Sequence, residues 1–237
     1  MTGTPDCLAH HLSSACIPAE STASSLLAAQ SRRGRVLKRT GDIVFSLVVL
    51  CLGSPVFLLL ALLVKLSSRG SVFYCQRRIG RGYKGFGCLK FRTMRRDADR
   101  VLASMLDADP SLRAEFERDH KLKRDPRITP LGKFLRRSSL DELPQFINVL
   151  RGEMSIVGPR PIVWDELRRY GRSMDEVLSV RPGLTGLWQV SGRNNLTYRT
   201  RVRLDLTYVR QRSFWLDLGI VLRTIGVVLL PMDRGAY

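Results

Sequence analysis

The sequence predicts an α+β fold in which a long hydrophobic helix, broken near its middle, packs on a small and mainly helical domain. Three observations predict it: an uncharged run over residues 43–64, two β-rich segments around "GRGYKGFG", and repeated helix-start signals after residue 97. We expect a tail over residues 1–34, a broken-helix region over residues 35–70 and a domain over residues 71–237 that works as one unit with that helix.

The composition of the chain restricts its partners. Lysine plus arginine number 39 against 21 aspartates and glutamates, which gives a net charge of +18 in 237 residues. Such a charge favours polyanions, namely nucleic acid, anionic lipid or phosphorylated small molecules, and does not choose among them. The five cysteines form no C-x-x-C pair, and the three histidines lie in polar stretches. The sequence therefore indicates neither a zinc site nor a disulfide framework.

The tail over residues 1–34 is rich in serine and alanine and is expected to be disordered. A signal peptide would need an apolar run of roughly 7 to 15 residues before its cleavage site. The tail offers only "SLLAA", so we expect it to stay on the protein.

The hydrophobic run from Ile43 to Val64 contains 22 uncharged residues, and about 20 are enough to span a bilayer. Basic residues lie on both flanks, and positive flanks stay on the cytoplasmic side. Pro55 has no N–H for the carbonyl of Cys51, so a sharp bend is expected at Ser54-Pro55, where Ser54 could satisfy that carbonyl. The pattern predicts a re-entrant membrane helix hairpin, with a kinked single-pass helix as the open alternative.

The C-terminal segment "FWLDLGIVLRTIGVVLL" is apolar but carries Asp217 and Arg223. It predicts an interfacial or packing helix of amphipathic character, with these two charges at the lipid headgroups.

Between these regions, "SVFYCQRRIG" and "FGCLKFRTM" predict two strands joined by a glycine-rich loop. Lys90 and Arg92 would project from the same face of the second strand, as site residues or as solvated charges. Residues 97–122 predict two helices broken at Asp109-Pro110, and Thr129-Pro130 predicts the start of a further short helix.

The segment "RRSSLDELPQ" contains two adjacent carboxylates, Asp141 and Glu142. Ser139 and Glu142 fit a capping box, yet Pro144 pushes the regular helix toward its own position and leaves both carboxylates at the helix mouth. We expect neighbouring arginines such as Arg136 to lower the pKa of the carboxylates. An ionised carboxylate could attack a phosphorus with the help of Mg²⁺. The pattern alone does not decide between cap and nucleophile.

Two later motifs carry further candidates. In "VGPRP" the prolines stiffen the chain around Arg160, whose planar fork suits phosphate, although an incidental turn arginine is the simpler interpretation. In "RPGLTGLWQVSGRNN" the glycines permit tight turns or close approach to a ligand, Arg193 follows, and Trp188 is favoured as a core residue. Asp205 in "RLDLTYV" indicates nothing by itself.

Taken together, these motifs resemble one known family. "KRTGD", the Ser54-Pro55 break, "LKFRTM", "SLDELPQFINVLRGEMSIVGPRP", "RPGLTGLWQVSGRN" and "RLDLTYV" occur in this order over about residues 36–230. The chain resembles the bacterial monotopic phosphoglycosyl transferases. It is most similar to the members that begin exopolysaccharide synthesis by moving hexose 1-phosphate from UDP-hexose to undecaprenyl phosphate, and within these to the galactose-type subgroup.

The resemblance implies a two-step mechanism at Asp141. Asp141 would attack the β-phosphorus of UDP-hexose and release UMP, and the lipid phosphate would then attack the phosphosugar intermediate. The resemblance also implies Mg²⁺ bound between Asp141 and the diphosphate, with Glu142 positioning the metal or a proton. Phosphate binding by four cations and a supporting polar role for one carboxylate are implied for Lys90, Arg136, Arg160, Arg193 and Asp205.

The resemblance places the protein on the cytoplasmic face of the bacterial inner membrane. Anionic lipid is then a further expected partner and nucleic acid is not, while a homodimer stays open. UDP-glucose or a UDP-N-acetylhexosamine are alternative donors. A noncatalytic, membrane-anchored basic protein would explain the charge and the apolar run, but not two carboxylates among cations.

Overall fold

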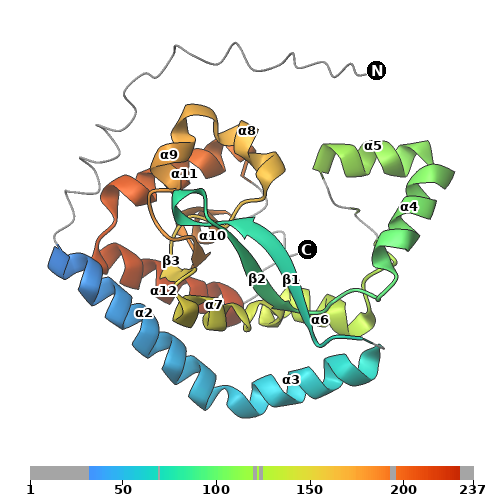
Figure 1. The fold of residues 1–237 in the computed structure, drawn as a ribbon, viewed down its shortest axis with the longest axis horizontal. Helices are drawn as coiled ribbons and strands as arrows, with labels where there is room; N and C mark the ends of the chain where they lie inside the picture. The colour runs from blue at the N-terminus through green and yellow to red at the C-terminus, as the bar shows by residue number, and fades with distance from the viewer. Residues whose placement is uncertain (1–31, 69, 120–121, 123–124, 193–195, 230–237) are drawn as a thin grey trace, which may run out of the picture.

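Helices make up most of the fold, joined by one antiparallel strand pair and one short parallel pair (Figure 1). The computed structural model describes residues 32–229, apart from residues 69, 120–121, 123–124 and 193–195. The predicted tail over residues 1–34 lies almost entirely outside the described residues, as do Arg193 and His120. The longer helices are α2 (Arg32–Leu52), α3 (Ser54–Ser67), α4 (Ala98–Ala108), α5 (Pro110–Asp119), α6 (Pro130–Ser138), α7 (Gln145–Arg151), α11 (Tyr198–Gln211) and α12 (Phe214–Leu229).

The remaining elements are short. The strands are β1 (Phe73–Ile79), β2 (Gly85–Phe91), β3 (Ser155–Val157) and β4 (Gly183–Thr185). The short helices are η1 (Arg81–Tyr83), η2 (Leu140–Glu142), η3 (Trp164–Glu166), α8 (Leu167–Tyr170), η4 (Gly171–Ser173), α9 (Met174–Val177) and α10 (Leu187–Ser191).

The predicted break in the hydrophobic helix is present. Helices α2 and α3 meet at an angle of 66° around Gly53, with Pro55 in the first turn of α3. The hydroxyl of Ser54 donates to the Cys51 carbonyl at 2.8 Å, which supplies the donor that Pro55 lacks, as predicted. Among the described helices none is long and apolar enough to cross a bilayer alone, whereas this bent pair together has the length and composition.

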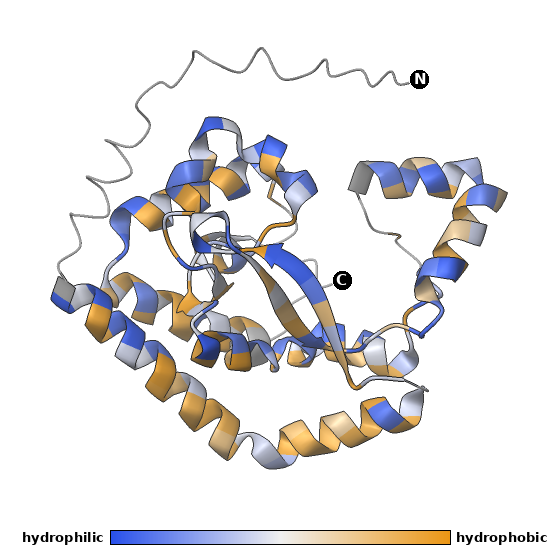
Figure 2. Ribbon diagram, viewed as in Figure 1, coloured by the Kyte–Doolittle hydropathy of each residue, from blue (hydrophilic) through white to orange (hydrophobic). Residues whose placement is uncertain are grey.

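The two faces of the bent pair differ. Leu60 and Val64 are buried and pack with Phe91 and Leu135 of the domain. The outer face exposes large apolar side chains along both helices, with Leu52 79 % exposed, and Figure 2 shows that apolar residues make up most of α3 and of the second half of α2. Folding against the domain therefore leaves a long apolar surface uncovered, which is far more than scattered exposed residues would produce.

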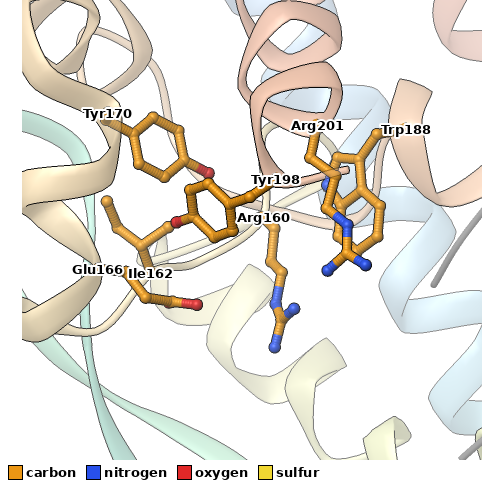
Figure 3. Close-up of a pocket in the computed structure, with 7 residues that line it drawn as sticks. All are labelled: Arg160, Ile162, Glu166, Tyr170, Trp188, Tyr198 and Arg201. Carbon is orange, nitrogen blue, oxygen red and sulfur yellow. The ribbon is translucent and has the colours of Figure 1, made fainter. Parts of the chain in front are cut away.

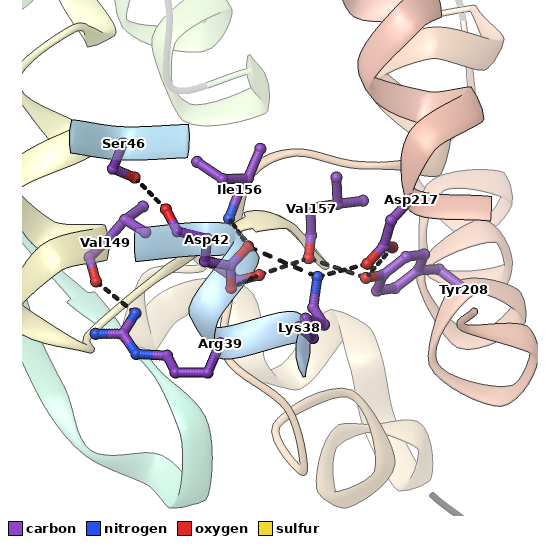
Figure 4. Close-up of polar contacts among 10 residues, drawn as sticks. Lys38, Arg39, Asp42, Ser46, Val149, Ile156, Val157, Tyr208 and Asp217 are labelled. Carbon is purple, nitrogen blue, oxygen red and sulfur yellow. Dashed lines mark hydrogen bonds and ion pairs between the residues drawn. The ribbon is translucent and has the colours of Figure 1, made fainter. Parts of the chain in front are cut away.

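The N-terminal half of α2 docks on the domain through charged groups (Figure 4). The ammonium of Lys38 lies 2.6 Å from Asp217 of α12. The Asp42 carboxylate accepts hydrogen bonds from the Ser155 hydroxyl at 2.7 Å and from the Ile156 N–H at 3.2 Å. We call Lys38, Asp42, Ser155, Tyr208 and Asp217 the docking cluster.

The docking cluster corrects one prediction about the C-terminal helix. Asp217 was expected at the lipid headgroups, yet it faces inward, where it pairs with Lys38 and accepts a hydrogen bond from the Tyr208 hydroxyl at 2.8 Å. An inward carboxylate is tolerated here because both of its oxygens have a donor. Arg223, in contrast, is exposed, and its predicted place at the lipid headgroups stays a prediction.

The predicted hairpin is confirmed, with β1 and β2 paired antiparallel from Phe73↔Phe91 to Ile79↔Gly85. Lys90 and Arg92 do not act together, however. The Arg92 guanidinium donates to the carbonyls of Val64 at 3.2 Å and Ser68 at 2.6 Å. Arg92 therefore satisfies carbonyls at the end of α3, a role for which cations are well suited.

The two predicted helix starts are also confirmed. Asp109 separates α4 from α5 and accepts a hydrogen bond from the Ser111 N–H at 2.8 Å. Thr129 caps α6 by accepting the Gly132 N–H at 2.9 Å. Both contacts follow from the preference of short polar side chains for exposed helix N–H groups.

The main core lies between β2, α7, β3, α11 and α12. Its buried side chains are Cys88, Val149, Met154, Ile156, Val157, Tyr208, Val209 and Ile220. Strand β3 runs through this core and pairs in parallel with β4. We did not predict this strand pair, because three-residue strands are too short to show a hydrophobic period.

Candidate active site

The two adjacent carboxylates lie in η2, between α6 and α7. Ser139 adopts a left-handed conformation (φ 58°) and closes α6, and its side chain caps no helix. The capping-box interpretation is therefore not confirmed, because the Ser139 side chain accepts no hydrogen bond from a helix N–H. Helix α7 begins at Gln145 with Pro144 as its N-cap, which confirms the later helix start. Asp141 and Glu142 together with Lys90, Arg136 and Arg160 are called the carboxylate site below.

Asp141 is only 8 % exposed. Burial raises its pKa to about 6, with a contribution from the negative charge of Glu142, although Lys90 and Arg136 act in the opposite direction. The predicted lowering is therefore wrong, because loss of water costs the charged form more than the cations return. A pKa of about 6 still leaves roughly nine-tenths of the carboxylate ionised at pH 7.

Glu142 is paired directly with β2. The ammonium of Lys90 lies 2.6 Å from its carboxylate, and the Gln145 side chain adds a hydrogen bond. Burial by itself would raise the pKa of Glu142, but Lys90, and then Arg160, outweigh it and hold the pKa below its ordinary value. The two neighbouring carboxyls thus differ: Glu142 is firmly ionised and paired, while Asp141 is the weaker acid of the two.

Arg136 approaches from the last turn of α6. Its Nε donates to the Thr93 hydroxyl at 2.9 Å, which orients the guanidinium. Burial lowers the pKa of Arg136, and the charge of Asp141 opposes that shift. The arginine predicted beside Asp141 is thus brought to it by the fold.

The segment that carries Arg160 is held by backbone contacts. The Gly158 N–H donates to Thr185 at 2.9 Å, and the Gly183 N–H donates to Pro159 at 2.8 Å. A Cβ atom on Gly183 would lie 2.1 Å from the Gly158 nitrogen. Gly183 therefore allows a close backbone approach, as predicted, and here the approach is between strand β4 and the residues that follow strand β3.

The Arg160 side chain lines a small, partly open pocket, and the charge of Arg160 helps to lower the pKa of Glu142. Trp188 in this pocket is 5 % exposed, which confirms it as a core residue. Figure 3 shows the lining side chains, which are Arg160, Ile162, Glu166, Tyr170, Trp188, Tyr198 and Arg201.

Asp205 lies behind this pocket on α11 and is 1 % exposed. It accepts a hydrogen bond from the Tyr170 hydroxyl at 3.1 Å. Burial raises its pKa to about 7, although Tyr170 and the main-chain N–H of Arg160 lower it. The Tyr170 hydroxyl bonds one oxygen of Asp205, whereas the other oxygen, Oδ1, is buried without a hydrogen-bond partner among the described residues.

We did not single out two arginines that the fold brings to this region. Arg78 of β1 is buried, donates to the Pro161 carbonyl at 3.1 Å and lies 3.6 Å from Glu166. Arg201 lies on α11, four residues before Asp205. That spacing was visible in the sequence, because residues four apart share one face of a helix.

The carboxylate oxygens are hard donors of the kind that Mg²⁺ prefers. Within residues 32–229, as far as they are described, no three His, Cys, Asp or Glu side chains gather to hold a metal ion. Magnesium is often held by one or two carboxylates, substrate phosphates and water, and the pair Asp141 and Glu142 suits that mode. The donor set therefore fits a metal that arrives with a phosphorylated substrate, and no dedicated protein cage is built from the described side chains.

Residues 33–231 match the family described as bacterial sugar transferase. The chain is 50 % identical over 204 residues to "Exopolysaccharide production protein ExoY" of Sinorhizobium fredii, which covers 86 % of this chain and 89 % of that protein. It is 51 % identical over 206 residues to "Undecaprenyl-phosphate galactose phosphotransferase" of Salmonella typhimurium, covering 87 % and 43 % of the two chains.

A third relative carries a different sugar in its name. The chain is 41 % identical over 200 residues to "UDP-glucose:undecaprenyl-phosphate glucose-1-phosphate transferase" of Escherichia coli, covering 81 % of this chain and 40 % of that one. The chain thus spans under half the length of the Salmonella and Escherichia proteins. With the family match extending over nearly all of the described residues, the chain belongs to the bacterial sugar transferase family.

Proposed function

We propose that this protein transfers a hexose 1-phosphate from UDP-hexose to undecaprenyl phosphate and releases UMP, as the first membrane step of exopolysaccharide synthesis. Galactose 1-phosphate is the proposed group, in line with the name of the Salmonella relative. The structural observation that carries the proposal is a buried Asp141 among cations with a pKa of about 6, beside a long exposed apolar helix pair.

The proposed chemistry is a double displacement at phosphorus. A carboxylate oxygen of Asp141 forms a bond to the β-phosphorus, and the bond from that phosphorus to the bridging oxygen breaks, so that UMP leaves. An oxygen of the lipid phosphate then attacks the same phosphorus and releases the Asp141 carboxylate. Each step conserves the hexose 1-phosphate, and no oxidant or reductant is needed.

The surrounding residues have supporting roles in this scheme. Lys90 keeps Glu142 ionised, and we assign Glu142 to positioning a metal ion or a proton. Phosphate binding is proposed for Lys90, Arg136 and Arg160, and Asp205 is proposed as a polar support. The same phosphate-binding role is proposed for Arg193, although it lies outside the described residues.

Magnesium fits the site in the substrate-bridged mode, with Asp141 as the proposed protein ligand. When bound there, Mg²⁺ would supply positive charge that offsets the repulsion between the carboxylate and the diphosphate. The residues of the chain hold and orient the groups around it.

For the membrane, we propose that the α2–α3 pair enters the cytoplasmic leaflet of the inner membrane and returns to the same face. The support is the 66° bend, the exposed apolar outer face and the basic residues at both ends. Single cysteines in place of Val36 and Ser71, in a background without other cysteines, test this topology. Both should react with an impermeant thiol reagent only from the cytoplasmic side, and opposite accessibility would mean a spanning helix.

The proposed reaction is tested with membranes that contain the protein, undecaprenyl phosphate and a panel of radiolabelled UDP-sugars. UDP-galactose should yield labelled lipid and UMP, and UDP-glucose and UDP-N-acetylhexosamines serve as competitors in the panel. Stronger labelling from UDP-glucose would move the proposal to that donor, for which the name of the Escherichia relative provides a reason. No UMP and no labelled lipid from any donor would leave only the noncatalytic, membrane-anchored binding protein.

A further inference from the structure

A buried arginine on strand β1 is held by three protein groups. Arg78 is 8 % exposed, and its guanidinium donates to the Gln76 side chain at 2.8 Å and to the Pro161 carbonyl at 3.1 Å. The same guanidinium lies 3.6 Å from the Glu166 carboxylate. An arginine whose donors are engaged in this way holds parts of the protein together and has few donors left for a ligand.

The contacts of this arginine continue into the neighbouring backbone. The Ile79 N–H donates to the Ile162 carbonyl at 2.9 Å, and these two residues form an isolated antiparallel bridge. The Val163 N–H donates at 3.1 Å to Glu166, so the carboxylate that faces Arg78 also holds this segment. The β1 clamp is the name used below for the contacts that residues 161–163 make with Arg78, Ile79 and Glu166.

The β1 clamp holds the chain directly after Arg160. Pro159 and Pro161 flank Arg160, and both restrict the backbone there. On the preceding side, the Gly183 N–H donates to the Pro159 carbonyl at 2.8 Å. The backbone at Arg160 is therefore fixed on both sides, and the position of its side chain depends on these contacts.

The hairpin that carries the clamp also reaches the carboxylate site. Strand β1 pairs with β2, and Lys90 of β2 lies 2.6 Å from the Glu142 carboxylate. Burial lowers the pKa of Arg78 and the positive charge of Arg160 lowers it further, whereas the charge of Glu142 acts in the opposite direction. Arg160 and Glu142 thus lie within electrostatic reach of Arg78, and the hairpin is the common support for both.

We propose that Arg78 is a positioning residue of this enzyme: through the β1 clamp it sets the place of Arg160 relative to Glu142, and thereby the binding of a substrate phosphate by Arg160. Arg78 itself does not touch the substrate. The inference rests on the proposed function for the identity of the ligand, and on the contacts of the β1 clamp for the role of Arg78.

The test compares Arg78→Gln with Arg77→Gln, a matched change of the exposed arginine next to it on the same strand. Arg160→Gln first identifies the affected substrate, UDP-hexose or undecaprenyl phosphate, as the one whose KM it raises by roughly tenfold. Arg78→Gln in the full chain should raise the KM for that same substrate by roughly fivefold, because the phosphate-binding group is misplaced. Arg77→Gln should stay within about twofold of the wild type.

A double variant shows whether Arg78 acts through Arg160. In the Arg160→Gln background, Arg78→Gln should change this KM by less than about twofold, because the guanidinium that it positions is gone. An equal change with and without Arg160 would overturn the inference, as would a lowered Tm with an unchanged KM. Arg78→Lys keeps the charge but not the fork and should lie between the wild type and Arg78→Gln. If Arg78→Gln does not fold, Arg78→Lys carries the same comparisons.

Amide hydrogen exchange tests the clamp without catalysis. In detergent micelles, peptides that contain residues 158–163 of the full chain should exchange at least about threefold faster in Arg78→Gln than in Arg77→Gln, while peptides from α4 exchange equally. That result would support the positioning role even if no UDP-sugar were a donor. Equal exchange in the two variants would defeat the inference and leave the proposed reaction in place.

Discussion

The docking cluster and the carboxylate site contain similar charged residues but differ in how completely the carboxylates are hydrogen-bonded. In the docking cluster every carboxylate oxygen has a donor: Asp42 accepts from Ser155 and Ile156, and Asp217 accepts from Lys38 and Tyr208. In the carboxylate site, no donor from another described residue reaches Asp141 beyond its own main-chain N–H, and the Arg160 guanidinium forms no ion pair with a described residue.

This difference separates charged residues with a structural role from those that are suited to a functional site. A buried charge whose partners are complete holds two elements together and has little left to offer a ligand. A buried carboxylate that receives no hydrogen bond from another described residue, such as Asp141, keeps its oxygens available for reaction or for a metal ion, as is typical of functional sites. Charge content alone would not separate these two regions, whereas the completeness of their hydrogen bonds does.

The largest expected effect that separates the two regions is on the rate of transfer. Asp141→Asn removes the proposed nucleophile but keeps the shape of the side chain, so transfer should fall by about a thousandfold or more. The measurement is the amount of labelled phosphosugar trapped on the protein, together with lipid product. The control is Asp165→Asn, an exposed aspartate near the pocket, which should behave like the wild type. Undiminished single turnover in Asp141→Asn would rule out the covalent step.

The next effect should appear in stability. Asp42→Ala leaves the Ser155 hydroxyl and the Ile156 N–H without their acceptor and weakens the docking of α2. We expect a loss of about 2 to 4 kcal/mol, which lowers the Tm by roughly 5 to 15 °C. Thermal unfolding in detergent micelles measures it, with exposed Asp99→Ala as the control. A Tm equal to that of the control would show that the docking cluster does not hold α2.

A smaller effect is expected in the pH dependence of the reaction at the carboxylate site. In the proposed mechanism Asp141 attacks in its ionised form, so kcat/KM should fall as the pH drops through about 6. Lys90→Met removes a cation that lowers the pKa of Asp141, so this acid limb should move to higher pH, by about one unit.

The matched control for the pH profile is Lys84→Met, an exposed lysine in the hairpin turn, which should leave the acid limb in place. An unshifted limb in Lys90→Met would mean that a group other than Asp141 titrates in the profile.

The smallest expected effect compares two tyrosines. Tyr208→Phe removes a hydroxyl that lies 2.8 Å from Asp217 and 2.9 Å from the Val157 carbonyl, and should cost about 1 to 2 kcal/mol of stability with little change in kcat/KM. Tyr170→Phe removes the side-chain donor to Asp205 and should raise the pKa of Asp205. Assays of Tm and of kcat/KM against pH distinguish the two. If both variants had the same Tm and the same dependence of kcat/KM on pH, the two tyrosines would not differ in role as proposed.

Several features were determined by the sequence itself, because their causes are local. Pro55 disrupts the hydrophobic helix in any tertiary setting, because its ring and missing N–H act on the preceding turn. Ser54 is close enough along the chain to donate a hydrogen bond to the Cys51 carbonyl. The same holds for the caps at Asp109 and Thr129. The order of the motifs indicated the family from the sequence alone, and the later helix start near Pro144 followed from the missing proline donor.

Other features were decided only by the tertiary structure, because they depend on groups far apart in the sequence. Burial, which no local pattern reports, raises the pKa of Asp141 where the neighbouring arginines had suggested a lowered value. The inward turn of Asp217 depends on Lys38, 179 residues away along the chain. Arg201 joins the site only because α11 brings it to Trp188 and Arg160. The sequence determined which charged residues are present, and the fold decided which of them come close enough to interact.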